Sequence, residues 1–403
     1  MKDIEQLKSL WKSLFGDTEA FISLFFQEVV REENIRVLEE KGRILSALYM
    51  LPYPFRIWNQ EVTASYISGA GTLPEAQGRG LMRRLLIDSF KEMELRQIPL
   101  SILIPAEPWL YGFYEKSGYA TVFAYNQQVY LPKDRRLGEE GVRLGEDNLQ
   151  QPQESLRYGK DGLQCGEDDL QYSENGLKYG EDAILSEKYS ISDMGDSFLQ
   201  EREDLMDTCF SYFDQRLRER NACILHSYAN FQTIVHDYAI SDGKIWVALN
   251  NEHIPVGIIF TVPAGGSSFV AKELMADSEE VKEVLLRTAL NHYHASSGIY
   301  RTVVSNTSSE EGQTIPFGMA RIIDANKVLS MWAAVNPERR LIIHLFDPLL
   351  TKNNGSFCIE SGKCYKTTNN KYNNAFEVLT MDIGQLAHFL ICPEYPFMSL
   401  MFD

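Results

Sequence analysis

The stretch best suited to chemistry spans residues 68–90 and reads SGAGTLPEAQGRGLMRRLLIDSF. A strand pattern ends at a proline, and Gly78 and Gly80 then open a helical pattern. The exposed N–H groups at the start of a helix form an anion site that suits a pyrophosphate. Glycine at this place lets the ligand approach the backbone closely. The spacing fits neither GxxxxGK[ST] nor GxGxxG, which argues against nucleotide hydrolysis and dinucleotide binding. Three arginines add positive charge here: Arg79, Arg83 and Arg84.

A second candidate group lies in LYGFYEKSGYA, residues 110–120, where Tyr111, Tyr114 and Tyr119 flank a predicted turn. Tyrosines in such a place commonly fill a core, but a tyrosine hydroxyl can also act as a general acid. Other clusters carry less. His292 and His294 are two residues apart on a predicted helix and would point to different faces, so they are not expected to share a metal.

The six cysteines form no CxxC pair and no zinc spacing, which predicts reduced thiols, a cytoplasmic protein and no metal site. They are residues 165, 209, 223, 358, 364 and 392.

Charge and length limit the classes of function. The chain has 403 residues, 39 Lys and Arg against 56 Asp and Glu, and a net charge of −17. Such a field repels nucleic-acid phosphates and anionic membranes, and it favours cationic partners such as amines. The charged N-terminal segment has no secretory apolar core, and no apolar run is long enough to span a bilayer. We therefore expect no nucleic-acid partner and no membrane.

Hydrophobic periodicity predicts a mixed α/β or α+β protein of several domains. From about residue 314 the chain alternates again, which predicts a smaller C-terminal α+β unit. The predicted helices cover residues 4–28, 81–96, 198–220, 278–294 and 383–390. The predicted strands cover residues 35–38, 44–51, 62–71, 101–104, 122–130, 222–225, 233–240, 244–249 and 256–262.

Residues 133–187 form an insert of different character, rich in glycine and acidic residues, with leucines seven residues apart. Only one position per heptad is reliably apolar, and a coiled-coil seam needs two. We therefore expect an expanded surface loop without a catalytic part. Removal of residues 140–182 should leave turnover largely intact.

The strand, the TLPEAQGRGLMRRLL turn and the later LYGFYEKSGYA run resemble the GCN5-related N-acetyltransferase (GNAT) superfamily. The resemblance implies that the turn Gln77–Met82 holds the pyrophosphate of acetyl-CoA; its sixth residue, Met82, departs from the family's glycine or alanine. It also implies that Tyr114 protonates the coenzyme A thiolate, with Tyr111 second. The residues expected to bind the cofactor are Gly71, Thr72, Leu73, Gly78, Arg79, Gly80, Leu81, Met82 and Arg83.

Two further segments, FGMARIIDANKVL and FDPLLTKNNGSFCIE, resemble the enhanced-intracellular-survival (Eis) type of acetyltransferase. The resemblance implies tandem GNAT folds followed by a small α+β domain like sterol carrier protein. The predicted domains are a catalytic GNAT domain 1–132, the insert 133–187, a degenerate GNAT-like domain 188–313 and a sterol-carrier-like domain 314–403. The second domain lacks the Gln-Gly-x-Gly turn. Relatives of this type form homo-oligomers, and a hexamer is implied.

The function implied is acetyl transfer from acetyl-CoA to a primary amine of a cationic small molecule, aminoglycoside-like or a polyamine, or to a protein lysine. The alternative is a non-catalytic acyl-CoA or lipid binder. In the resembling family the C-terminal carboxylate acts as the base, which implies that role for Asp403, after Met401-Phe402. Which of the two carboxylates of Asp403 would face the amine stays open.

Overall fold

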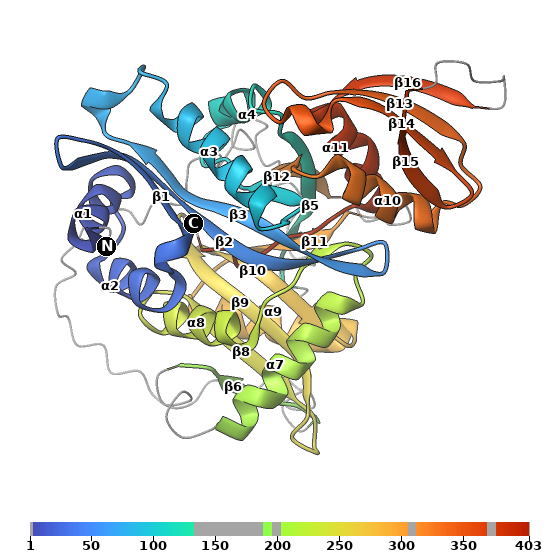
Figure 1. Ribbon diagram of the computed structural model, residues 1–403. Coiled ribbons are helices and arrows are strands. Elements are labelled where there is room, and N and C mark those ends of the chain that lie inside the picture. The colour runs from blue at the N-terminus through green and yellow to red at the C-terminus, as the bar shows by residue number, and fades with distance from the viewer. Residues whose placement is uncertain (1–2, 133–187, 196–202, 305–311, 369–375, 403) are drawn as a thin grey trace, which may run out of the picture. The chain divides into compact units, whose positions relative to one another are not determined.

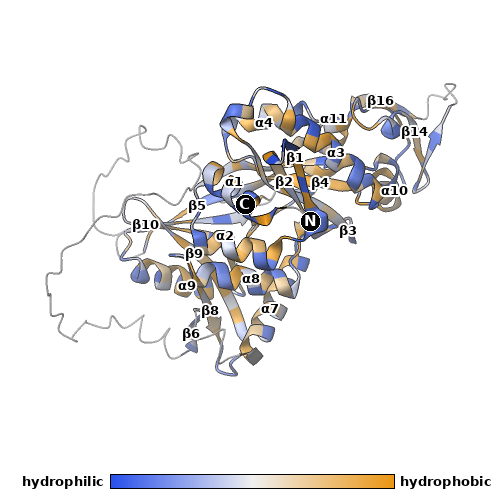
Figure 2. Ribbon diagram, turned by 60° about the vertical axis from the view of Figure 1, so that its left-hand side comes forward, coloured by the Kyte–Doolittle hydropathy of each residue, from blue (hydrophilic) through white to orange (hydrophobic). Residues whose placement is uncertain are grey.

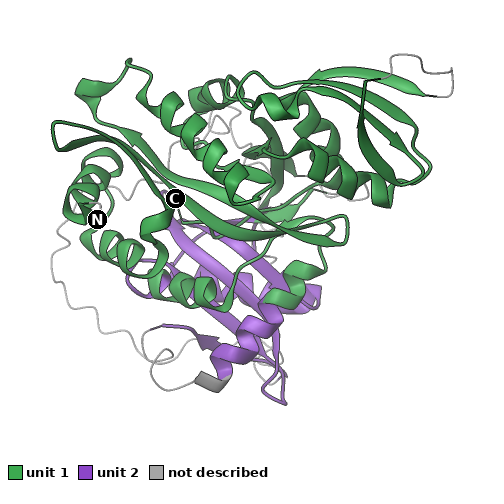
Figure 3. Cartoon of the chain, in the orientation of Figure 1, with its two compact units in different colours: residues 1–128, 214–237, 301–403 green, residues 129–213, 238–300 purple. Residues whose placement is uncertain are grey.

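The computed structural model describes residues 3–132, 188–195, 203–304, 312–368 and 376–402. The insert 133–187 and Asp403 lie outside these described residues. The chain divides into two compact units, of which unit 1 holds residues 1–128, 214–237 and 301–403, and unit 2 holds residues 129–213 and 238–300 (Figure 3). In the described part of the chain, no helix is long and apolar enough to cross a membrane.

Unit 1 is built on a mixed sheet whose neighbouring strands are antiparallel except at one parallel pair, β3 with β4 (Figure 1). A short strand, β7 (Cys223–Ile224), adds to β2. In spatial order the strands are β1 (Ile35–Glu40), β2 (Arg43–Ile57), β3 (Gln60–Thr72), β4 (Leu100–Leu103), β12 (Gln313–Ile322) and β5 (Ala120–Tyr130).

Helices cover both faces of β2 and β3. On one face, α3 (Leu81–Leu95) buries Leu86 and Phe90 in a core that includes Met50 and Ile67. On the other face, Trp11 of α1 (Ile4–Phe15) packs against Tyr49, with ring centroids 5.4 Å apart. Figure 2 shows both hydrophobic and hydrophilic residues along α1 and α3, as expected for helices that bury one face against a sheet. Other helices near this sheet include α2 (Glu19–Leu24), the π-helical turn η1 (Phe25–Val29) and α4 (Pro108–Glu115).

The last ninety residues contribute to unit 1 in two ways. Strand β12 pairs antiparallel with both β4 and β5, so a segment some 200 residues later in the chain completes the first sheet. A second, four-stranded sheet follows, packed with α10 (Ala325–Val335) and α11 (Ile383–Ile391). Its strands in spatial order are β15 (Lys363–Thr367), β14 (Gly355–Glu360), β13 (Leu341–Phe346) and β16 (Glu377–Asp382).

Unit 2 has its own core, formed by strands and a helix. Helix α9 (Glu279–His292) buries Val281, Leu285 and Ala289 against strand residues such as Ile259 and Phe269. Helices α7 (Glu203–Arg218) and α8 (Tyr228–Ala239) each cross the division between the units. The strands in spatial order are β11 (Ser297–Val303), β10 (Ser268–Ala276), β9 (Pro255–Ala264), β8 (Lys244–Leu249) and β6 (Ser190–Asp193).

The mixed α/β fold class is confirmed, with two local corrections. The helix predicted over 4–28 is broken, because Gly16 ends α1 in the left-handed conformation (φ 74°) and Thr18 caps α2. The strand predicted over 233–240 is wrong, since these residues lie in α8, whose start is capped by Ser227. The predicted domain bounds stay predictions; β12 begins at one of them and pairs with strands of the first predicted domain.

Candidate active site

The site begins where two neighbouring strands separate. Strand β3 pairs with β4 only from Ala64 to Tyr66. Beyond that point β3 continues along β2 to Thr72, while β4 pairs with β12. From Ile67 to Thr72, β3 therefore has no strand partner on its β4 side within the described part of the chain. Main-chain groups along this edge are available to an extended ligand arm.

Two glycines let helix α1 lie directly on this end of β3. A Cβ at Gly69 would sit 2.2 Å from the Trp11 ring, and one at Gly71 would sit 2.3 Å from Leu14 Cδ1. The pairing with β2 shifts register here, since Ala47 faces Gly71 while Tyr49 faces Ser68. The one extra residue on β3 forms a bulge, and Gly69 in it has φ 54°.

The predicted cofactor residues of β3 differ in what their main chain already binds. The Gly71 carbonyl accepts from Ser46 Oγ (3.0 Å), and the Leu73 N–H donates to the Leu45 carbonyl (2.9 Å), both toward β2. Because main-chain groups alternate in direction along a strand, those of Thr72 face the unpaired edge, where its carbonyl accepts from Gln77 Nε2 (3.2 Å). Among the main-chain groups of these three residues, the Thr72 N–H is therefore the one best placed to contact a ligand arm.

The predicted glycine turn contains two glycines in the left-handed conformation just before α3. Gly78 and Gly80 both have φ 74°, and Gly80 is the N-cap of α3 without a side-chain capping bond. The first N–H groups of α3, on Leu81, Met82 and Arg83, thus lack an intrahelical acceptor. No described atom lies within 4 Å of a Cβ built on either glycine, so the turn opens to free space.

The charges around the turn are partly used. Arg79 forms an ion pair with Glu40 on β1. Arg83 and Arg84 are exposed and form no ion pair among the described residues. Both sit on the first turn of α3, where a phosphate would meet the helix dipole as well as the guanidinium groups.

Tyr114 lies in the last turn of α4 and is buried, with 6% of its surface exposed. It shares one hydrophobic core with Ile67 of β3 and Leu86 of α3, and Met82 packs against the same core. Its hydroxyl has no hydrogen-bond partner within the described part of the chain. Burial raises the pKa of Tyr114 to about 12. The hydroxyl is thus protonated at neutral pH, and the side chain lies in the same core as Ile67 of β3.

Tyr111, the second candidate, is placed differently. Its hydroxyl donates to the main-chain carbonyl of Phe317 on β12, at 3.0 Å. Burial raises the pKa of Tyr111 to about 12 as well. Since its proton already has an acceptor, Tyr111 is the less available acid of the two.

The C-terminal tail is fixed to the same strand. Phe402 is 4% exposed, and its carbonyl accepts from Ser68 Oγ at 2.7 Å in a buried hydrogen bond. Upstream, the N–H of Phe397 donates to the Ala222 carbonyl (3.1 Å), and His226 Nε2 contacts the Ser399 carbonyl (3.0 Å). The chain is therefore held next to the bulge of β3 up to the residue before Asp403, which itself lies outside the described residues.

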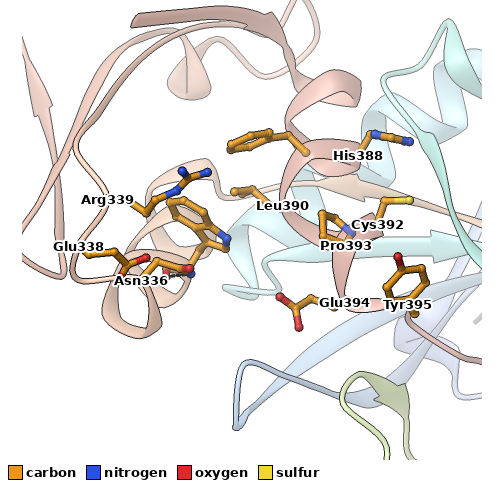
Figure 4. Close-up of a pocket in the computed structure, with 11 residues that line it drawn as sticks. Asn336, Glu338, Arg339, His388, Leu390, Cys392, Pro393, Glu394 and Tyr395 are labelled. Atoms are coloured by element: carbon orange, nitrogen blue, oxygen red, sulfur yellow. Dashed lines mark hydrogen bonds between the residues drawn. The ribbon is translucent and has the colours of Figure 1, made fainter. Parts of the chain in front are cut away.

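A groove of about 680 Å³ lies elsewhere, between α10 and α11, and holds none of the predicted site residues (Figure 4). Glu338 and Glu394 line it together with Arg339 and His388. Opposite charges and aromatic walls in one open groove indicate no single ligand. In addition, no cluster of three or more His, Cys, Asp or Glu side chains suited to a metal occurs among the described residues.

Two residues at the site had no assigned part in the sequence analysis. Ser68 lies in the stretch 68–90, but a single serine carries no sequence signal for a hydrogen bond to Phe402 at the far end of the chain. Arg321 is a charged residue in the apolar run MARII, and the structure shows it fully buried next to the end of α4. A single arginine inside an apolar strand pattern was the available signal.

Residues 1–122 match the family profile described as "Acetyltransferase (GNAT) domain". This chain carries a GNAT domain. It contains the unpaired strand, the glycine turn and Tyr114, and the chain is accordingly an acetyltransferase. Proteins of this superfamily use acetyl-CoA and act on amines. No curated protein sequence matches the chain.

Solved structures with similar folds extend beyond the GNAT domain to nearly the whole chain. A GCN5-related N-acetyltransferase from Anabaena variabilis has TM-score 0.63 at 17% identity, covering 95% of this chain and 86% of that one. A probable N-acyltransferase of unknown function from Enterococcus faecalis has TM-score 0.62 at 13% identity, with the same coverage. Eis1 from Mycobacterium abscessus has TM-score 0.61 at 12% identity, covering 96% and 86%. At these identities the likeness establishes the fold alone.

Proposed function

We propose that this chain transfers the acetyl group of acetyl-CoA to a primary amine of a cationic small molecule, aminoglycoside-like or a polyamine. A protein lysine is the other acceptor of the same chemistry. The observation that carries the proposal is Tyr114, a buried side chain inside a GNAT domain whose protonated hydroxyl has no hydrogen-bond partner among the described residues. A net charge of −17 favours cationic acceptors.

The proposed step balances through two proton transfers. The neutral amine nitrogen attacks the thioester carbonyl carbon, a C–N bond forms and the C–S bond breaks. A base takes the proton that leaves the amine, and Tyr114 gives its proton to the departing thiolate sulfur. At neutral pH the hydroxyl of Tyr114 is protonated, so its proton is present when the thiolate forms.

The coenzyme is proposed to lie along β3 and the start of α3. In this arrangement Thr72 and its neighbours bind the pantetheine arm through main-chain groups, and the N–H groups of residues 78–83 bind the pyrophosphate. Arg83, exposed and without an ion pair among the described residues, adds a charge-assisted contact. The open space over Gly78 and Gly80 supports this placement.

The base is proposed to be a carboxylate of Asp403. The support is indirect and comes from the buried tail, whose Phe402 carbonyl is bonded to Ser68 beside the bulge of β3. A free α-carboxylate has a pKa of roughly 3.5, too low for an ideal base, and burial would raise it. As an anion it would also attract the ammonium form of the acceptor.

Three features are proposed from the resemblance to Eis-type acetyltransferases alone. They are a degenerate second GNAT-like domain, a C-terminal domain like sterol carrier protein, and a homohexamer. Light scattering on the purified chain measures the oligomeric state directly, and a monomer would contradict the hexamer.

The function is tested by following free-thiol release from acetyl-CoA with a panel of aminoglycosides, polyamines and lysine peptides. Tyr114→Phe is expected to lower kcat about 100-fold, in the range for loss of a general acid. Tyr130→Phe is the matched control, since Tyr130 is also buried but bonds to Glu283 in unit 2, and it should retain activity. If no amine in the panel causes thiol release, the result would favour the alternative function, a non-catalytic acyl-CoA or lipid binder. Loss of activity in Tyr111→Phe but not Tyr114→Phe would reassign the acid.

A further inference from the structure

Arg321 is a charged side chain in the middle of an apolar strand. It lies on β12 with 0% of its surface exposed. Its Nη2 donates to both carboxylate oxygens of Asp347, each at 2.8 Å, and Asp347 is also fully buried. A buried charge persists only when it is paired and hydrogen-bonded, so the two residues form one unit.

The other amino group of Arg321 reaches the end of the helix that carries Tyr114. Nη1 donates to the main-chain carbonyl of Ser117 at 2.8 Å. The guanidinium also lies over the Phe90 ring of α3, 4.6 Å from its centroid. A Cβ on Gly118 would lie 1.8 Å from Nη1, and Gly118 has φ 82°. The guanidinium of Arg321 thus occupies the space that any side chain at position 118 would fill.

This turn holds Tyr114 by both main chain and side chain. The Tyr119 N–H donates to the Tyr114 carbonyl (3.3 Å), and the Gly118 N–H donates to the Glu115 carbonyl (2.8 Å). These two bonds around a left-handed glycine are a Schellman ending of α4. The rings of Tyr114 and Tyr119 pack at 5.7 Å, and the Tyr119 hydroxyl bonds to Ser101 Oγ at 2.6 Å.

We propose that the buried Arg321–Asp347 pair is a positioning device for Tyr114: it fixes the turn 117–119, and through that turn the place of the tyrosine hydroxyl. The inference rests on the proposed acid role of Tyr114 and deepens it. Arg321 touches neither substrate nor coenzyme in this account. A fork of two amino groups joins the carboxylate to the turn, which a lysine ammonium does not reproduce. Misplacement of a reacting group by a small distance is enough to slow the reaction strongly.

The test is a double-mutant cycle on the full chain with Arg321→Lys and Tyr114→Phe, measuring kcat and KM for acetyl-CoA. Arg321→Lys is expected to lower kcat at least tenfold with KM changed less than twofold. In the Tyr114→Phe background the same substitution should lower kcat less than twofold, because the residue it positions has lost its proton donor.

A matched control separates positioning from general stability. Asn353 donates to Asp347 Oδ2 (2.9 Å) and accepts from the Ala325 N–H (3.0 Å), and neither bond involves Arg321 or the turn 117–119. Asn353→Ala should lower the melting temperature while kcat stays within twofold of the unsubstituted chain. If Arg321→Lys gives no folded protein, Asp347→Asn replaces it in the cycle, and a kcat loss confined to the Tyr114 background is again expected.

Two results overturn the proposal: an unchanged kcat in Arg321→Lys, or equal losses of kcat in both backgrounds. A kcat in Tyr114→Phe equal to that of the unsubstituted chain would instead refute the acid role of Tyr114, on which the inference rests. If Tyr114→Phe lowers kcat and the double variant shows the product of the two single losses, the acid role of Tyr114 stands and only the positioning role of Arg321 is refuted.

Discussion

Replacing Gly80 with valine separates the cost of backbone strain from the cost of blocking a ligand. Gly80 has φ 74° and ψ 13° at the N-cap of α3, and a Cβ there would meet nothing within 4 Å. Gly16 has nearly the same conformation, φ 74° and ψ 10°, at the end of α1, with equally free space. In the unliganded chain both substitutions therefore cost only left-handed strain, roughly 2 kcal/mol of folding free energy.

The two variants are expected to differ once acetyl-CoA is added. In Gly80→Val the new side chain projects into the space proposed for the pyrophosphate, so affinity should fall at least tenfold, about 1.4 kcal/mol. In Gly16→Val the affinity should stay within twofold, although the melting temperature falls by a similar amount. Isothermal titration calorimetry measures both affinities. Equal affinity in the two variants would refute the placement of the pyrophosphate on this turn.

Three further outcomes follow from the same site. Deletion of Phe402 and Asp403 should lower kcat/KM at least 100-fold, about 2.7 kcal/mol, with acetyl-CoA affinity nearly unchanged. A C-terminal tag should lower kcat/KM similarly, and full activity in both variants would exclude the tail from catalysis. Burial raises the pKa of Tyr114 from 10 to about 12, so the folded state holds this proton more tightly. That contribution to stability is therefore present below about pH 10 and lost as the pH rises toward 12, and kcat should show no limb from Tyr114 below pH 10. A limb near pH 9 that disappears in Tyr114→Phe would contradict this. Deletion of residues 140–182, which lie outside the described part of the chain, should leave kcat within twofold; a lost cooperative melt would show that the insert contributes to folding.

The local pattern predicted most elements near the site but failed where two signals competed. Helix α3 and strands β3 and β4 begin within two residues of their predicted places, because glycine, proline and apolar spacing agree there. In α8 the β-branched Thr233, Ile234 and Val235 favoured a strand. The buried positions Phe231, Ile234, Val235 and Tyr238 follow the three-to-four spacing of a helix, and packing of that face decided the outcome.

The candidate site divides in the same way. The glycine turn was predictable because its conformation depends on residues next to one another in the chain. The contacts of Ser68 with Phe402 and of Arg321 with Ser117 join residues hundreds of positions apart. No spacing rule connects such residues, because their meeting depends on β12 entering the sheet between β4 and β5 and on the fold of the tail.

The most direct test of the central claim is a crystal structure of the full chain with coenzyme A bound. We predict the pyrophosphate on the N–H groups of residues 78–83, the pantetheine arm along β3 beyond Tyr66, and the sulfur within hydrogen-bond reach of the Tyr114 hydroxyl. Coenzyme A bound in the groove between α10 and α11, or a sulfur remote from Tyr114, would contradict the account.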